Sequence, residues 1–355
     1  MGTIVTFAQR RRKLVMTGVA VAAAAGVAAA VLPAVADSGG SGRSSGPSTG
    51  AARSGHAGHT GRADHAGQGE EGIAVRSGAL ARGKGATVLA ASLNGANEVP
   101  VQGGPAVGDK DGAALEFVKV KGDKVSVAVK WRGTGKPVML HIHQGGKGVN
   151  GGVKVDFTKL LDHARGRTVT GTVKVADAAL LGRLKADPGS FYANLHTAEF
   201  PGGAVRGQLH KVTTDFDFRH ALNNFQASVI KGRQIYECKK SADGTKAFAQ
   251  RDVSALLGGP IAHSFVKPGS GTPQWIAADR SAVTGALISK TPNGDRNIPE
   301  LDLRATQSGK HRGLLAGTAE ILRLNTVGGV APAGTCKAGA IVGVPYAADY
   351  VFVNR

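Results

Sequence analysis

The feature that most constrains the fold of this chain is a series of short runs in which apolar and polar residues alternate. In one run Val125, Val127, Val129 and Trp131 alternate with lysine, serine and alanine. This alternation is typical of a strand with one buried face, because successive side chains of a strand point to opposite sides. Glycine, at 53 of 355 residues, suits the turns between such strands. We therefore expect a mainly β protein that contains an antiparallel β-sandwich.

Three local patterns refine this expectation. Gly122-Asp123 separates two strands as a hairpin turn does. Further strands are expected at 153–157 and 168–175, where β-branched and aromatic residues recur. One helix is expected at 178–185, with Asp177 as its N-cap.

The first 85 residues are expected to lie outside the folded part. Residues 10–13 are basic, 14–36 are apolar, and Ala34-Val35-Ala36 fits a small-x-small cleavage site. Residues 1–36 are therefore predicted to be a signal peptide, with a retained membrane anchor as the alternative. Cleavage would leave no stable transmembrane helix. Residues 37–85, which are rich in Gly, Ser, Ala and His, are predicted to be a disordered linker.

The charge of the chain favours contact with the cell envelope rather than binding of nucleic acid. The net charge is +19, but it is spread along the sequence, and we find no nucleic-acid recognition motif. A basic surface favours contact with anionic cell-wall polymers or with another envelope protein. We expect a secreted, extracellular or cell-envelope location. The Arg-Arg-Lys-Leu-Val run at 11–15 resembles a twin-arginine export signal.

Two histidine-bearing segments are the strongest functional signal. His141 and His143 would share one face of a strand, and His196 would share a face with Tyr192 and Asn194. If these strands pair, three imidazoles converge, and three histidines suit copper or zinc. The alternative is a structural cluster that hydrogen-bonds at the end of the strands.

The same segments resemble a known family. The resemblance runs from about Thr87 to Val212 and is to the CHRD domain, the module repeated in chordin and found singly in secreted bacterial proteins. It is carried by Leu93-Asn94-Gly95-Ala96-Asn97-Glu98-Val99-Pro100, by Gly112, by the His141-Ile142-His143 strand, by Asn150-Gly151 and by the run from Leu195 to Leu209. The resemblance implies a small β-sandwich over 86–212 and no settled activity. One departure is Ala204, where the family usually has an acidic residue.

Residues 213–355 are expected to form a second, mostly β domain. The domain holds both cysteines, Cys238 and Cys336, and an even count in an exported protein predicts a disulfide. Two free thiols or a metal pair are the alternatives. The domain resembles a secreted bacterial and fungal family of unknown function. The resemblance is carried by 232–238, Ala262-His263, 273–275, 323–329 and 345–352.

This second domain offers only a weak candidate pocket. His263, Arg323, Tyr346 and Asp349 are candidates to line it, but they show no spacing that marks a catalytic site. Arg323 with Asp349 is equally well explained as a structural ion pair. Tyr346 and Tyr350 are expected on one face of a turn, in packing.

Two function classes follow from these observations. The first is an exported, non-catalytic binding protein whose ligand is unknown. The second is a copper or zinc protein with redox chemistry, because the His-x-His strand is similar to the metal strand of copper–zinc superoxide dismutases. That similarity is incomplete, since no His-rich loop separates His143 from His196. We therefore expect binding rather than catalysis.

Overall fold

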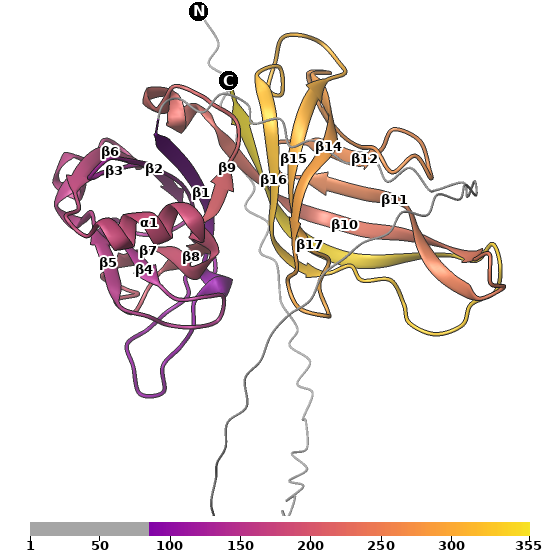
Figure 1. The fold of residues 1–355 in the computed structure, drawn as a ribbon, viewed down its shortest axis with the longest axis horizontal. Helices are drawn as coiled ribbons and strands as arrows, with labels where there is room; N and C mark the ends of the chain where they lie inside the picture. Colours follow the sequence, from indigo (N-terminus) through magenta and orange to yellow (C-terminus); the bar gives the residue numbers. More distant parts are fainter. Residues whose placement is uncertain (1–84) are drawn as a thin grey trace, which may run out of the picture. The chain divides into compact units, whose positions relative to one another are not determined.

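The computed structural model describes residues 85–355, and these residues form two antiparallel β-structures (Figure 1). The predicted signal peptide, its cleavage site and residues 37–84 of the predicted linker lie outside the described residues. The prediction of a mainly β fold is confirmed. Among residues 85–355, no helix combines the length and the apolar character needed to cross a membrane.

The first structure is a nine-stranded sheet. Its central path runs in the order β5-β4-β7-β8-β1-β2-β3-β6, and β9 pairs with β1. The strands are β1 (Ala86–Asn94), β2 (Ala113–Lys121), β3 (Lys124–Arg132), β4 (Pro137–Gln144), β5 (Val153–Asp156), β6 (Thr168–Lys174), β7 (Phe191–Thr197), β8 (Val205–Gln208) and β9 (His210–Val212).

This sheet folds over a single core, as a sandwich does. Val155 of β5 and Val169 of β6 come from opposite ends of the strand order, yet both belong to one buried apolar cluster. The alternating valines of β3 point into this cluster, and α1 (Ala178–Ala186) adds three leucines. The prediction of a sandwich is therefore confirmed.

The local predictions for this part are also confirmed. Gly122 has a φ of 58° between β2 and β3, a left-handed conformation that glycine adopts without strain. The Asp177 side chain accepts a hydrogen bond of 2.8 Å from the Leu180 amide at the start of α1. Short 3₁₀ helices lie at Gly95–Asn97, Thr158–His163, Pro188–Ser190 and Phe218–Asn223.

The second structure is a closed eight-stranded barrel, in which β10 pairs with both β11 and β17. Its strands are β10 (Phe225–Lys240), β11 (Lys246–Leu257), β12 (Ile261–Phe265), β13 (Pro273–Ala277), β14 (Ala282–Thr291), β15 (Glu300–Gln307), β16 (Thr318–Gly328) and β17 (Ile341–Asn354). Cys238 of β10 and Cys336 of the loop before β17 form a disulfide, as predicted. Neither a free thiol nor a cysteine metal pair is therefore present in the described residues.

A further apolar cluster joins the two structures. It contains residues of the first sheet, such as Ala90 and Phe117, together with Leu322 and Val351 of the barrel. In addition, the buried Asp349 carboxylate accepts a hydrogen bond from Ser92 of β1. The sheet and the barrel therefore pack against each other through shared buried side chains.

Candidate metal centre

Strand pairing brings the three predicted histidines together. In the β4–β7 register, His141 lies opposite Asn194, His143 opposite Tyr192, and Met139 opposite His196. Residues directly opposite in a pair, and residues two apart along a strand, share one face of the sheet. All three histidines therefore lie on one face, the opposite face from Leu140 and Ile142 of the core.

Each of the three rings is held by one of its two nitrogens. His143 Nδ1 lies 2.9 Å from the Gly151 carbonyl oxygen, and His196 Nδ1 lies 3.0 Å from that of Pro201. A carbonyl only accepts, so each Nδ1 is the protonated nitrogen and each Nε2 carries a free lone pair. His141 is held by its other nitrogen, since its Nε2 lies 3.2 Å from Thr158 Oγ1 and 3.4 Å from an Asp156 oxygen.

The remaining nitrogen of each ring has no partner in the part of the chain that the structure describes. His141 Nδ1, His143 Nε2 and His196 Nε2 are buried and have no hydrogen-bond partner among the described residues. One ligand atom from each histidine lies within 4.8 Å of those of the other two. Bonds of about 2.0–2.1 Å to one tetrahedral metal require nitrogens about 3.4 Å apart. The cluster therefore lies close to the spacing that one metal ion requires.

The protein keeps these rings neutral, which is the form that binds a metal. Burial, followed by repulsion from His196, lowers the pKa of His141 to about 4. Burial also lowers the pKa of His143 and of His196, although their carbonyl partners oppose the shift. All three lone pairs are therefore available near neutral pH.

Two residues that sequence reasoning did not single out as site residues support His143. The Tyr192 ring stacks on the imidazole with centroids 4.9 Å apart and an interplanar angle of 7°. Arg206 lies above Tyr192 and donates to Asn150 Oδ1 and to the carbonyls of Gly146 and Val149. Arg206 thus fixes the loop that presents Gly151 to His143.

A carboxyl group lies near the same face. Glu98 is contacted by Asn194, whose Nδ2 lies 3.5 Å from one carboxyl oxygen, while the other oxygen has no partner among the described residues. Burial raises the pKa of Glu98 to about 7, against the opposing effect of Arg206. Glu98 does not belong to the cluster of three close ligand atoms. Ala204, the departure from the family pattern, is fully buried.

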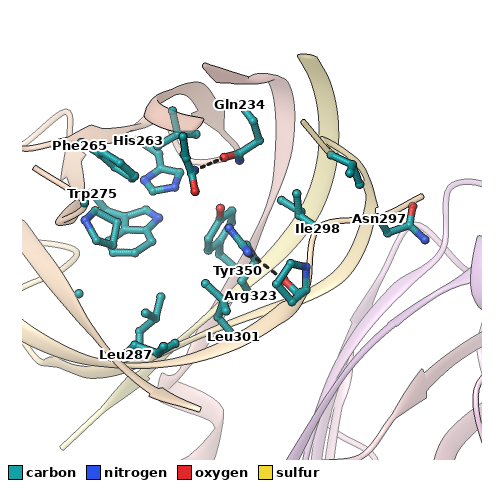
Figure 2. Close-up of a pocket in the computed structure, with 18 of the residues that line it drawn as sticks. Gln234, His263, Phe265, Trp275, Leu287, Asn297, Ile298, Leu301, Arg323 and Tyr350 are labelled. Carbon is teal, nitrogen blue, oxygen red and sulfur yellow. Dashed lines mark hydrogen bonds between the residues drawn. The ribbon is translucent and has the colours of Figure 1, made fainter. Parts of the chain in front are cut away.

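The candidate residues of the second domain separate onto two faces. His263, Arg323 and Tyr350 line a cavity inside the barrel (Figure 2). The Tyr346 hydroxyl contacts that of Tyr350 at 3.2 Å. Both tyrosines lie on strand β17, so the expectation of a turn was wrong.

Asp349 does not face that cavity. As the neighbour of Tyr350 in a strand, it points to the opposite face. Its carboxylate accepts from Ser92, Asn94 and Asn325, at 3.0, 3.1 and 2.7 Å, and from Ser228 at 2.5 Å. No ion pair joins it to Arg323 among the described residues.

Comparison with known families agrees with the resemblances stated above. Residues 89–209 match the CHRD domain, and residues 259–354 match a family described as "Protein of unknown function (DUF3455)". Both predicted resemblances are confirmed. No curated protein and no solved structure matches the chain.

Proposed function

We propose that this chain is an exported, non-catalytic binding protein whose CHRD-like domain binds one divalent transition metal through His141, His143 and His196. Two observations carry the proposal: each of the three rings has one buried nitrogen without a partner among the described residues, and one ligand atom from each histidine lies within 4.8 Å of those of the other two. The other nitrogen of each ring is already engaged by a carbonyl, hydroxyl or carboxylate oxygen. Metal-binding histidines in proteins have this same outer support.

The alternative of a purely structural cluster accounts less well for these atoms. A structural cluster gains stability by pairing its polar atoms, and each buried group left unpaired costs about 1–3 kcal/mol. Here the His141 ring meets the other two edge to face, His143 and His196 are tilted at 40°, and the centroids lie 5.3–6.1 Å apart; no hydrogen bond joins one ring to another. A metal ion would satisfy all three lone pairs at once.

The ligand set favours copper or zinc. Imidazole nitrogen suits both metals, whereas magnesium and calcium prefer oxygen ligands. By the general order of divalent affinities, Cu²⁺ is expected to bind more tightly than Zn²⁺. Glu98 and Asn194 lie beside the cluster and outside it.

Redox chemistry of the superoxide-dismutase kind is the second candidate function. The observation in its favour is that only three protein ligands converge, which leaves a further coordination position for a small molecule. Neither matching family description names an activity, and binding alone accounts for the site. We therefore place binding first.

Export is supported by the disulfide and by the N-terminal sequence. Disulfides persist mainly in oxidising compartments outside the cytosol. Residues 1–36 would be removed, and the basic mature chain would associate with anionic wall polymers or with another envelope protein. Mass spectrometry of secreted protein should find Asp37 at the N-terminus, and an intact Met1 would contradict cleavage.

The test of metal binding uses secreted protein purified without a polyhistidine tag. Titration with Cu²⁺ and with Zn²⁺ in competition with a chromogenic chelator should give one equivalent of each. His143→Ala and the triple variant His141→Ala/His143→Ala/His196→Ala should lose this equivalent. The exposed His163 lies in the same domain but outside the cluster, so His163→Ala is the matched control.

The outcomes separate the candidate functions. Equal copper uptake by the wild type and the triple variant would leave only a structural role for the cluster. Rapid dismutation of superoxide by the copper-loaded wild type, lost in His143→Ala, would favour the redox function over simple binding.

A further inference from the structure

The interior of the barrel contains a cavity that the metal centre does not use. Its volume is about 440 Å³, and its lining includes residues from all eight strands. Most of the lining is apolar, and its apolar side chains include Phe265, Trp275, Leu287, Leu301 and Leu303. Cavities of this size and character are typical of small-molecule sites.

One formal charge lies in the wall of this cavity. Arg323 of β16 is only 9% exposed, and its Nη2 donates to the Pro299 carbonyl at 2.8 Å. The lining contains no aspartate or glutamate, and Arg323 makes no ion pair among the described residues. Burial of an unpaired charge is costly, so a group of opposite charge has much to gain here.

The buried polar atoms of the lining that lack a hydrogen-bond partner among the described residues are all donors. Arg323 Nε, Trp275 Nε1 and Gln234 Nε2 are buried and have no acceptor among the described residues. All three atoms are N–H donors. His263 adds no charge, because burial lowers its pKa to about 3 and its Nδ1 is engaged by the Gln274 carbonyl. The wall therefore has spare donors and one cation, which complement an anion.

The apolar part of the wall is preformed. His263 and Trp275 stack with ring centroids 4.4 Å apart, and Tyr350 meets both rings edge to face. In Figure 2 the side chains of His263, Trp275, Leu287, Leu301 and Arg323 surround one open space. Leu287 is 60% exposed although it lines the cavity, so it marks an opening to solvent.

We propose that the barrel cavity binds a small carboxylic acid with an apolar body. The carboxylate pairs with Arg323, and the body contacts the aromatic rings and the leucines. A planar guanidinium is well suited to a carboxylate, which it can hold through two parallel hydrogen bonds. This site is independent of the histidine cluster and does not rest on the proposed metal function.

The test measures binding of four probes to the whole secreted chain by calorimetry. Octanoate and 3-phenylpropanoate carry the charge, whereas octan-1-ol and 3-phenylpropanamide have the same bodies without it. At least one acid should bind, about tenfold or more tightly than its neutral counterpart, because the pair with Arg323 is lost in the latter. The acid that binds more tightly shows whether the site prefers an aliphatic or an aromatic body.

Variants locate the site. Arg323→Gln should weaken binding of the acid about tenfold or more and bring it to the level of the neutral probe. Arg304→Gln removes the same charge from an exposed position on the neighbouring strand β15 and should leave binding unchanged. Leu287→Trp, at the exposed opening, should reduce binding of whichever acid the wild type binds, by obstructing entry.

The experiment can overturn the proposal in three ways. If neither acid binds at millimolar concentration, the cavity is not a site for carboxylic acids. If acid and neutral probes bind equally, the charge of Arg323 plays no role in binding. Undiminished binding by a folded Arg323→Gln variant would place the acid elsewhere. If Arg323→Gln does not fold, the comparison of probes on the wild type and the Leu287→Trp variant decides the matter.

Discussion

The guanidinium carbon of Arg206 lies 3.4 Å from the centre of the Tyr192 ring, and the same ring stacks on His143. Arg206 is almost completely buried and donates to two carbonyls of the loop that precedes Gly151. An ion–ring–imidazole stack therefore connects this loop to a proposed metal ligand. Arg206 and Tyr192 act as positioning residues, since neither of them has an atom in the ligand set.

We expect Arg206→Ala to weaken copper binding by about 10–100-fold, the range found for residues that orient metal ligands. Without the guanidinium, the loop would no longer hold the Gly151 carbonyl against His143 Nδ1. Competition titration measures the effect, with Arg183→Ala, an exposed arginine of α1, as the control. Equal affinity in Arg206→Ala and Arg183→Ala would deny Arg206 this role.

Copper should stabilise the folded protein. A metal that binds only the folded chain adds about 2.7 kcal/mol to the free energy of unfolding when its free concentration is 100 times Kd. Differential scanning calorimetry should show a rise in the melting temperature with Cu²⁺ and a return to the starting value with a chelator. The triple histidine variant should show neither change. A rise of the same size in that variant would point to copper binding elsewhere.

The metal-free protein should lose stability between about pH 6.5 and pH 4. The pKa values of all three histidines are lowered in the folded state, that of His141 to about 4. In this window the unfolded chain takes up protons that the folded chain does not, so the free energy of unfolding falls as the pH falls. Thermal unfolding at pH 7 and pH 4.5 should show a larger loss for the wild type than for the triple variant. Parallel losses in the two proteins would show that other groups dominate.

Glu116 gives the opposite pH dependence. It is fully buried, both of its carboxyl oxygens lack partners among the described residues, and burial raises its pKa to about 8. The folded state therefore keeps a proton that the unfolded chain releases, and the free energy of unfolding falls as the pH rises from about 4.5 to about 8.

Glu116→Gln should remove this loss, which is on the order of a few kcal/mol. The variant should melt at a higher temperature than the wild type at pH 8.5 and close to the wild type at pH 5. Glu199→Gln, at an exposed site, is the control. A wild type and a Glu116→Gln variant with the same pH profile would show that the buried carboxyl finds a partner.

The disulfide should make a large contribution to stability. Cys238 and Cys336 are 98 residues apart in sequence, and closing a loop of this length contributes up to about 4.7 kcal/mol in the chain-entropy model. The double variant Cys238→Ser/Cys336→Ser should melt well below the wild type. Titration of thiols in the denatured, unreduced wild type should find none, and two reactive groups would disprove the bond.

The alternation of side chains between the two faces of a strand accounts for what could be predicted of the metal centre. Residues two apart share a face, so His141 and His143 could be placed side by side from sequence alone. The β4–β7 register could not be read in this way, and it is this register that brings His196 level with Met139. The role of Arg206 was also hidden, because most of its partners are atoms of a loop that lies 56–60 residues earlier.

The same reasoning failed in the second domain where an element was misassigned. Tyr346 and Tyr350 were expected on one face of a turn, and Tyr346 and Asp349 were both candidates to line one pocket. In the observed strand β17, side chains alternate between the two faces, so Asp349 lies on the opposite face from both tyrosines. Closure of the barrel could not be predicted from the sequence either. Strands β10 and β17 pair across more than 100 residues, and the hydrophobic pattern carries no information about pairing partners.

The apolar cluster that joins the sheet and the barrel has a consequence for dissecting this protein. Cutting the chain between the two β-structures would expose Phe117 on one fragment and Leu322 and Val351 on the other, all of them at most 1% exposed in the whole chain. It would also leave the buried Asp349 carboxylate without Ser92 and Asn94. The family boundaries in the sequence are therefore poor places to truncate, and fragments made there should aggregate.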